Sequence, residues 1–272
     1  MTMAYINCCA PNKPNVYTDG AMSNPSCQLW SLLGVGLWWP KRTLLEHDLS
    51  EQEKKYPCGN IETSEGVKLW ACMRGYRGSS TRAEIAAIIL AMLTPNAIHV
   101  ATDSNNAKLG FEKLIAYIQE QDIRENNENH YEEWPMGKHW SLINDGDLWQ
   151  QAWSILLQRG QASFRISKVK GHARDIDVQH SQELAEHKKG NDIADDAADL
   201  GLESNGNGKA AYGSYLHRRQ EAYTKLVGEI QTMLVEVLKL SIEKRQQQRK
   251  KKDPVKGSTK EKLKTKSLLP EG

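Results

Sequence analysis

Hydrophobic and polar positions follow two different periods along most of the chain. Short apolar runs rich in β-branched and aromatic residues predict strands, while apolar residues recurring every three to four positions predict helices. The strands are expected at 16–21, 34–40, 69–76, 98–103 and 164–170. The helices are expected at 81–93, 105–118, 148–157 and 191–200. Three early strands followed by alternating helices and strands predict an α/β domain, with a mixed five-stranded sheet flanked by helices.

Two polar stretches interrupt this pattern. The first, at 41–68, separates the second expected strand from the third, and the second is an acidic connector at 119–146. Compact domains rarely carry structureless loops longer than about 12–15 residues without a reason. We therefore interpret 41–68 as an insertion.

The character of the chain changes after residue 202. Residues 203–245 are expected to form a Gly/Asn-rich linker and an amphipathic helix, whose apolar stripe would pack on the rest of the chain or on a second copy. Residues 246–272 are Lys-rich and expected to be disordered. From Ser241 to the end there are 11 Lys and Arg against 4 Asp and Glu, although the formal charge of the whole chain is only +2. Such a tail could tether nucleic acid, serve as a nuclear import signal, or be a solvated segment without function.

The cysteines and the apolar runs bear on the compartment. The five cysteines form no CxxC pair, so we expect neither a disulfide framework nor structural zinc. No basic region followed by an apolar stretch begins the chain, and no apolar run approaches about 18 residues. We expect a soluble protein inside the cell, nuclear or cytoplasmic, without a membrane segment.

Four acidic residues stand where a strand ends or a helix begins. They are Asp19 in VYTDGA, Glu84 in STRAEIAA, Asp103 in HVATDS and Asp195 in GNDIADDAAD. A fold that gathers four carboxylates offers hard oxygen ligands of the kind that Mg²⁺ and Mn²⁺ prefer. Two such ions can drive phosphodiester hydrolysis.

Each of these residues also has an ordinary structural interpretation. Asp19 could belong to a turn, and Glu84 could complete a capping box with Thr81. Asp103 could cap the helix that follows it, and Asp195 could lie on a solvated helix face. It is the order and context of all four together that favour a metal site.

That order resembles the ribonuclease H family, type 1 branch, over about residues 15–200. The matching segments are YTDG at 17–20, TRAE at 81–84, TDS at 102–104, DGDLWQ at 145–150, KGH at 170–172 and GNDIAD at 190–195. The resemblance implies a ribonuclease H-like fold with a catalytic domain over 15–202, preceded by an N-terminal extension at 1–14. It also implies an endonuclease that hydrolyses the RNA strand of RNA–DNA hybrids with two Mg²⁺ ions, or Mn²⁺, leaving 5′-phosphate and 3′-hydroxyl ends.

The resemblance also assigns roles to residues. Asp19 would bridge the two ions beside Asp103, and Glu84 and Asp195 would complete the metal ligands. The family pattern selects Asp195 within its acidic cluster, with Asp192 as the second choice. His172 would assist proton transfer and product release, although an incidental surface histidine is the alternative.

Substrate contacts follow from the same resemblance. An A-form-like hybrid presents its 2′-hydroxyls across a wide, shallow minor groove. The residues expected along that groove are Asn24, Ser80, Thr81 and Asn105.

Two other interpretations stay open at this point. The chain could be the ribonuclease H part of a reverse-transcribing element and act beside a reverse transcriptase or another nucleic-acid enzyme. Alternatively, it could be a nucleic-acid-binding module that kept the fold without catalysis. The sequence leaves the oligomeric state, the preferred metal and the physiological substrate open.

Overall fold

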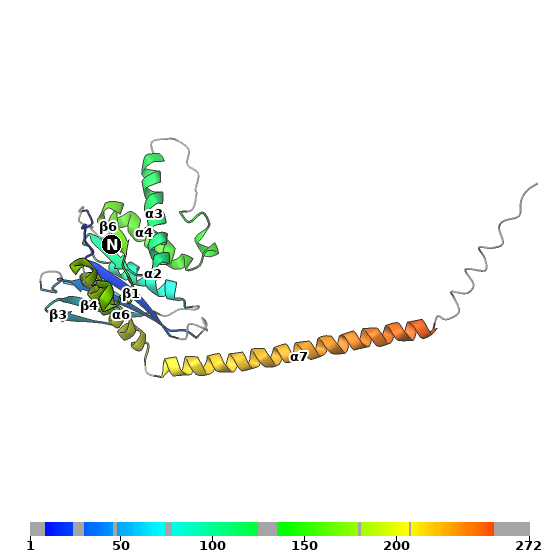
Figure 1. The fold of residues 1–272 in the computed structure, drawn as a ribbon. Helices are drawn as coiled ribbons and strands as arrows, with labels where there is room; N and C mark the ends of the chain where they lie inside the picture. Colours follow the sequence, from blue (N-terminus) through cyan, green and yellow to red (C-terminus); the bar gives the residue numbers. More distant parts are fainter. Residues whose placement is uncertain are drawn as a thin grey trace, which may run out of the picture. The chain divides into compact units, whose positions relative to one another are not determined.

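The computed structural model describes residues 9–23, 30–45, 48–73, 78–124, 135–178, 181–206 and 208–252 (Figure 1). The chain divides into two units, Met1–Tyr215 and Leu216–Gly272. The first unit contains the sheet and the candidate site, and the second contains most of one long helix.

The first unit is built on one six-stranded mixed sheet. Its strands are β1 (Val16–Met22), β2 (Leu33–Pro40), β3 (Gly59–Thr63), β4 (Gly66–Met73), β5 (Ile98–Thr102) and β6 (Phe164–Lys168). They lie in the order β3-β4-β2-β1-β5-β6. The pairs β3–β4, β4–β2 and β2–β1 are antiparallel, whereas β1, β5 and β6 are parallel. The predicted mixed α/β architecture is therefore confirmed.

The expected number of five strands was wrong, because the insertion at 41–68 adds a strand and a short helix. Strand β3 pairs with β4, and α1 (Glu51–Lys55) begins with a capping box formed by Ser50 and Glu53. The buried Glu53 also pairs with Arg42 at 2.7 Å. Strand β3 is mostly exposed and polar, so it lacks the apolar alternation by which a strand is detected in sequence.

A pair of thiols lies at the edge of this insertion. Cys58, directly before β3, has its Sγ 3.3 Å from the Sγ of Cys72 in β4, and both are free cysteines. The strand pairing brings them together, and their separation along the chain gave no sign of it.

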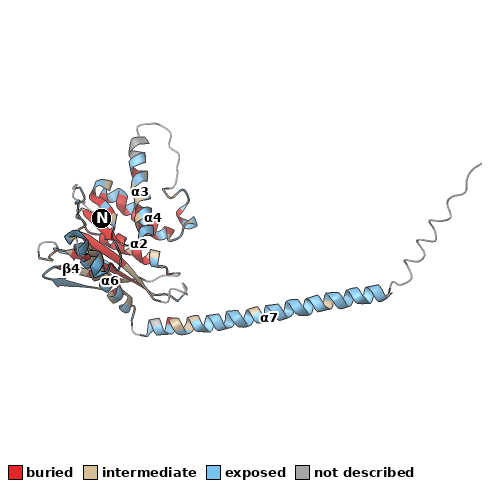
Figure 2. Ribbon diagram, in the orientation of Figure 1, coloured by how far each residue is buried: buried red, intermediate tan, exposed pale blue. Residues whose placement is uncertain are grey.

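Helices cover both faces of the sheet. They are α2 (Ser80–Ala91), α3 (Asn105–Arg124), α4 (Gly146–Arg159), α5 (Asp175–Val178) and α6 (Gln182–Glu203), with 3₁₀ turns η1 (Trp140–Leu142) and η2 (Gln161–Ser163). A large core joins the sheet to α2, α3 and α4, and includes Phe111 and Trp149 in edge contact. A smaller cluster, around Trp38 and Ala194, joins the sheet to α6. Figure 2 shows the buried residues concentrated in these layers.

Helix α6 lies unusually close to β2. A Cβ atom added to Gly36 would lie 2.2 Å from the carbonyl oxygen of Ala194 and 2.2 Å from the amide nitrogen of Ala198. Gly34 has the same relation to Ala198 and Leu202 one turn further on. Glycine at both strand positions therefore lets the helix backbone rest on the strand, and this contact fixes the height of α6 above the sheet.

The long helix α7 (Lys209–Lys252) ends the described chain. It continues to Lys252, so the prediction that disorder begins at Gln246 was wrong for residues 246–252. Gln, Arg and Lys are good helix formers, and they extend the helix without an apolar face. The rest of the Lys-rich tail lies outside the described residues. Within the part of the chain that the structure covers, no helix is long and apolar enough to cross a membrane.

Candidate metal centre

Asp19 lies in the middle of the sheet. It occupies β1 opposite Gly36 of β2, its side chain is 7% exposed, and its Oδ1 accepts a hydrogen bond of 2.7 Å from the amide of Gly20. A Cβ on Gly20 would lie 2.6 Å from the backbone nitrogen of Glu84. Glycine at this position therefore permits the close approach of α2 to β1 that brings the two carboxylates together.

Glu84 does not cap its helix. The N-cap of α2 is Ser79, whose hydroxyl accepts from the amide of Arg82, so Glu84 lies in the second turn. Its side chain is 8% exposed, and among the described residues its Oε2 has no hydrogen-bond partner. The capping-box alternative is therefore excluded, and a buried carboxylate oxygen is left facing the site.

Asp103 follows β5 directly. Strands β1 and β5 are parallel neighbours, and Thr18 lies opposite Thr102. Asp19 is the next residue after Thr18, and Asp103 is the next residue after Thr102, so the two aspartates lie at matching positions. The following helix is capped by Ser104, whose hydroxyl accepts from the amide of Ala107. Asp103 is therefore not needed as a helix cap.

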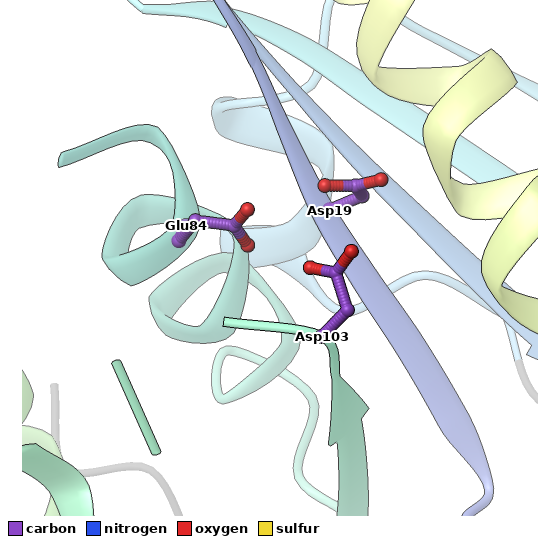
Figure 3. Close-up of side chains that lie close together, drawn as sticks. All are labelled: Asp19, Glu84 and Asp103. Atoms are coloured by element: carbon purple, nitrogen blue, oxygen red, sulfur yellow. The ribbon is translucent and has the colours of Figure 1, made fainter. Parts of the chain in front are cut away.

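The carboxylates of these three residues point toward one another (Figure 3). One oxygen atom from each of Asp19, Glu84 and Asp103 lies within 4.8 Å of the others. Burial, followed by the charge of Asp103, raises the pKa of Asp19, and burial, followed by the charge of Asp19, raises the pKa of Glu84. Converging oxygens, one of them without a partner, suit a hard divalent cation that would neutralise this repulsion.

Asp195 approaches the cluster from α6 but is not one of the three converging carboxylates. It is partly exposed, and its charge contributes to the raised pKa of both Asp19 and Glu84. Asp192, the second choice, has its carboxylate 2.6 Å from the ammonium of Lys188. That ion pair directs Asp192 elsewhere and leaves Asp195 as the α6 carboxylate that acts on the cluster.

The loop after β6 touches the cluster through a glycine. A Cβ on Gly171 would lie 2.0 Å from Oδ2 of Asp103, so any side chain at this position would displace that carboxylate. The next residue, His172, is exposed and has a positive φ of 47°. The steric role of Gly171 was not recognised in the sequence, although it stands directly before the predicted histidine.

His187, which lies in α6, has a structural partner. Nδ1 of His187 lies 2.9 Å from the hydroxyl of Tyr17, which is itself buried in the sheet. His180 lies outside the described residues.

The expected substrate contacts fall at two helix starts. Ser80 and Asn105 are exposed at the first positions of α2 and α3, and Thr81 is partly buried beside Ser80. Helix α2 contains Glu84, and α3 begins two residues after Asp103. The polar side chains at the starts of these helices therefore flank the cluster. Asn24 lies outside the described residues.

An ion-pair network, also not recognised in the sequence, fixes the start of α2. Nη1 of Arg82 lies 3.1 Å from Oδ1 of Asp145, and its Nη2 lies 2.5 Å from Oδ2 of Asp147. The hydrogen bonds that Arg82 donates to Asp147 and Asp145 raise the pKa of its guanidinium. The DGDLWQ segment thus braces α2 two residues before Glu84.

Comparison with known proteins gives the following result. No family model and no curated protein matches the chain. Structural neighbours of the chain are ribonuclease H domains. The ribonuclease H domain of prototype foamy virus is 18% identical, with a TM-score of 0.39, over 69% of this chain and 92% of that one. The protein LC9-RNase H1, described as a type 1 ribonuclease H with the type 2 active-site motif, is 14% identical, with a TM-score of 0.39, over 73% of this chain and 77% of that one.

A longer viral protein is also similar. The prototype foamy virus protease-reverse transcriptase is 17% identical, with a TM-score of 0.42, over 74% of this chain. This chain spans only 22% of the length of that protein. The foamy viral protein has also been solved in complex with an RNA/DNA hybrid. At these identities and scores, the likeness does not by itself assign an activity.

Proposed function

We propose that the chain is a metal-dependent endonuclease that hydrolyses the RNA strand of RNA–DNA hybrids, leaving 5′-phosphate and 3′-hydroxyl ends. One observation carries the proposal: Asp19, Glu84 and Asp103 converge from three separate elements, with an unpartnered buried oxygen on Glu84. A purely structural role would not leave a buried carboxylate oxygen without a cation or an amide, as Oε2 of Glu84 is left among the described residues. Two Mg²⁺ ions would activate the attacking water and stabilise the departing 3′ oxygen when bound.

The protein's own residues would divide the work around that centre. Asp19, Glu84 and Asp103 would hold the metal between β1, α2 and the end of β5, and Asp195 would add a ligand from α6. Because these side chains project from the backbone of strands and helices, their carboxylate oxygens are held in place before substrate binds. His172 is exposed and directly follows Gly171, which lies against Asp103. Its imidazole would transfer a proton as the product leaves.

Recognition of RNA would come from polar groups beside the carboxylates. Ser80 and Asn105 can exchange hydrogen bonds with 2′-hydroxyl groups, which are present on RNA and absent from DNA. Both stand at helix N-termini, where backbone amides and the helix dipole favour a nearby phosphate. This arrangement supports a hybrid, whose minor groove offers the 2′-hydroxyls of one strand.

The proposal is tested by cleavage of a labelled RNA–DNA hybrid with Mg²⁺ or Mn²⁺. Matched single- and double-stranded RNA and DNA serve as substrates for comparison, and Asp19→Asn serves as the inactive variant. We expect metal-dependent cutting of only the RNA strand of the hybrid, lost in the variant. Tight binding of the hybrid without cutting under either metal would instead support a binding module.

His172→Ala is expected to slow turnover by about 10²-fold, the low end of what general acid–base groups contribute. The carboxylates would still hold metal, so activity should remain well above that of the Asp19→Asn variant. Single-turnover cleavage of the hybrid measures the effect, with His217→Ala in α7 as the control histidine. A His172→Ala rate equal to that of the unmodified protein would remove this residue from the mechanism.

A further inference from the structure

Helix α7 presents a line of exposed apolar residues. They are Tyr223, Leu226, Ile230, Met233, Val237 and Leu240, each between 44% and 58% exposed. Other exposed apolar residues of the helix lie off this line, at Val227, Leu234, Val235, Leu238 and Ile242. Figure 2 shows α7 as mostly exposed along its length. A single helix in water gains little from such residues, and most helical stability in proteins comes from packing an apolar face. The line therefore calls for a partner.

The spacing of the line identifies the kind of partner. Successive members are separated alternately by three and four residues, an average of 3.5, and the line begins at Tyr223 because the preceding d position is Arg219. On a straight helix of 3.6 residues per turn such a repeat drifts by about 20° per heptad, and supercoiling around a second helix keeps it on one side.

We propose that α7 pairs with α7 of a second copy of this chain as a parallel two-stranded coiled coil over residues 223–240. In heptad terms, Ile230 and Val237 occupy a positions, and Leu226 and Leu240 occupy d positions. β-branched residues at a with leucine at d favour two parallel strands over higher assemblies. In each core layer of the dimer, a residue would then contact the same residue of the second chain.

The charged flank of the line selects the parallel orientation. Glu229, Glu236 and Glu243 all occupy g positions. In an antiparallel pair, g positions face g positions, so these carboxylates would repel one another across the interface. In a parallel pair, g faces e of the partner, where this chain has Leu234 and Ser241, and that repulsion is absent.

The same register predicts where the pairing ends. The next a position after Val237 is Lys244, and the next d position after Leu240 is Gln247. A lysine and a glutamine in the core layers stop the apolar seam, and the helix continues as a basic, solvated segment. The dimer would therefore carry two basic ends beyond one apolar seam.

The test measures the mass of the full chain by sedimentation, with two matched double variants. Ile230→Lys/Val237→Lys places lysine at two a positions, whereas Val235→Lys/Ile242→Lys places it at two f positions on the opposite side. Val235 and Ile242 are 48% and 53% exposed, so the two pairs differ in heptad position rather than in exposure. We expect twice the 30.7 kDa of one chain for the unmodified protein and for the f variant. The a variant should weaken the dimer by more than about 100-fold, because buried lysines oppose each other.

A cysteine at a d position tests the orientation. Leu226→Cys should form an intermolecular disulfide at residue 226 on mild oxidation with diamide, located by peptide mapping against the unmodified protein. In an antiparallel pair residue 226 would face the region of residue 237, and this bond would not form. A monomeric unmodified chain, equal dimerisation of both double variants, or absence of the 226–226 bond would each overturn the proposal.

Discussion

Asp103→Asn is expected to abolish hydrolysis of the hybrid and, at the same time, to raise the melting temperature of the metal-free protein. Activity should fall by about 10³-fold, because a preorganised group that stabilises transition-state charge is worth 10²–10³ in rate. Stability should rise because Asp103 repels the buried carboxylates of Asp19 and Glu84, and its charge raises the pKa of both. Removing that repulsion is expected to contribute about 1–2 kcal/mol, or roughly 2–8 °C for a domain of this size.

The two halves of this result are measured separately. Thermal unfolding is recorded in EDTA, and cleavage is recorded with Mg²⁺. Asp196→Asn is the matched control, because Asp196 is an exposed carboxylate on α6 whose nearest cation, Lys68, lies 3.8 Å away. An unchanged or lowered melting temperature for Asp103→Asn would contradict the electrostatic account of the site, even if activity were lost. Such opposition between activity and stability is common at functional sites.

The stability of the metal-free protein is expected to fall as pH rises. Burial and neighbouring charges raise the pKa of Asp19 and Glu84 in the folded state above the value of about 4 of an unfolded chain. Between these values the folded protein binds more protons than the unfolded chain does. The free energy of unfolding therefore decreases from about pH 4 upward, until both carboxyls are ionised in the folded state.

Metal should reverse this trend. Bound Mg²⁺ requires ionised carboxylates, so the difference in melting temperature between Mg²⁺ and EDTA should grow with pH. Thermal unfolding from pH 5 to pH 8 with and without Mg²⁺ measures the effect, and Glu84→Gln should flatten the pH dependence in EDTA. If the unmodified protein in EDTA became more stable over this range, the raised pKa values would not control its stability.

The residues of the candidate cluster could be proposed from sequence because the order and context of their motifs together resemble those of the ribonuclease H family. Parallel strands β1 and β5 bring Asp19 and Asp103 to neighbouring positions, a consequence of strand order that the alternation of elements implies. The packing that completes the site could not be proposed in this way. The close approach at Gly20 and Gly171 depends on distances between segments far apart in the chain, which no local pattern encodes.

The missed elements have a common physical reason. Strand β3 and helix α1 are held by polar contacts, such as the buried pair of Arg42 and Glu53, rather than by an apolar face. Hydrophobic periodicity detects burial of apolar side chains and is blind to elements stabilised in other ways. The ion pairs of Arg82 with α4 were missed for the same reason.

The two outer strands of the sheet have a consequence for aggregation. An edge strand offers unpaired backbone groups to which a strand of another molecule can add. Here β3 is short and carries the exposed Glu62, while β6 carries the exposed Arg165 and Lys168. Charges on a short edge oppose the addition of further strands. The sheet is therefore protected from growing into a fibre by the charges on both of its edges.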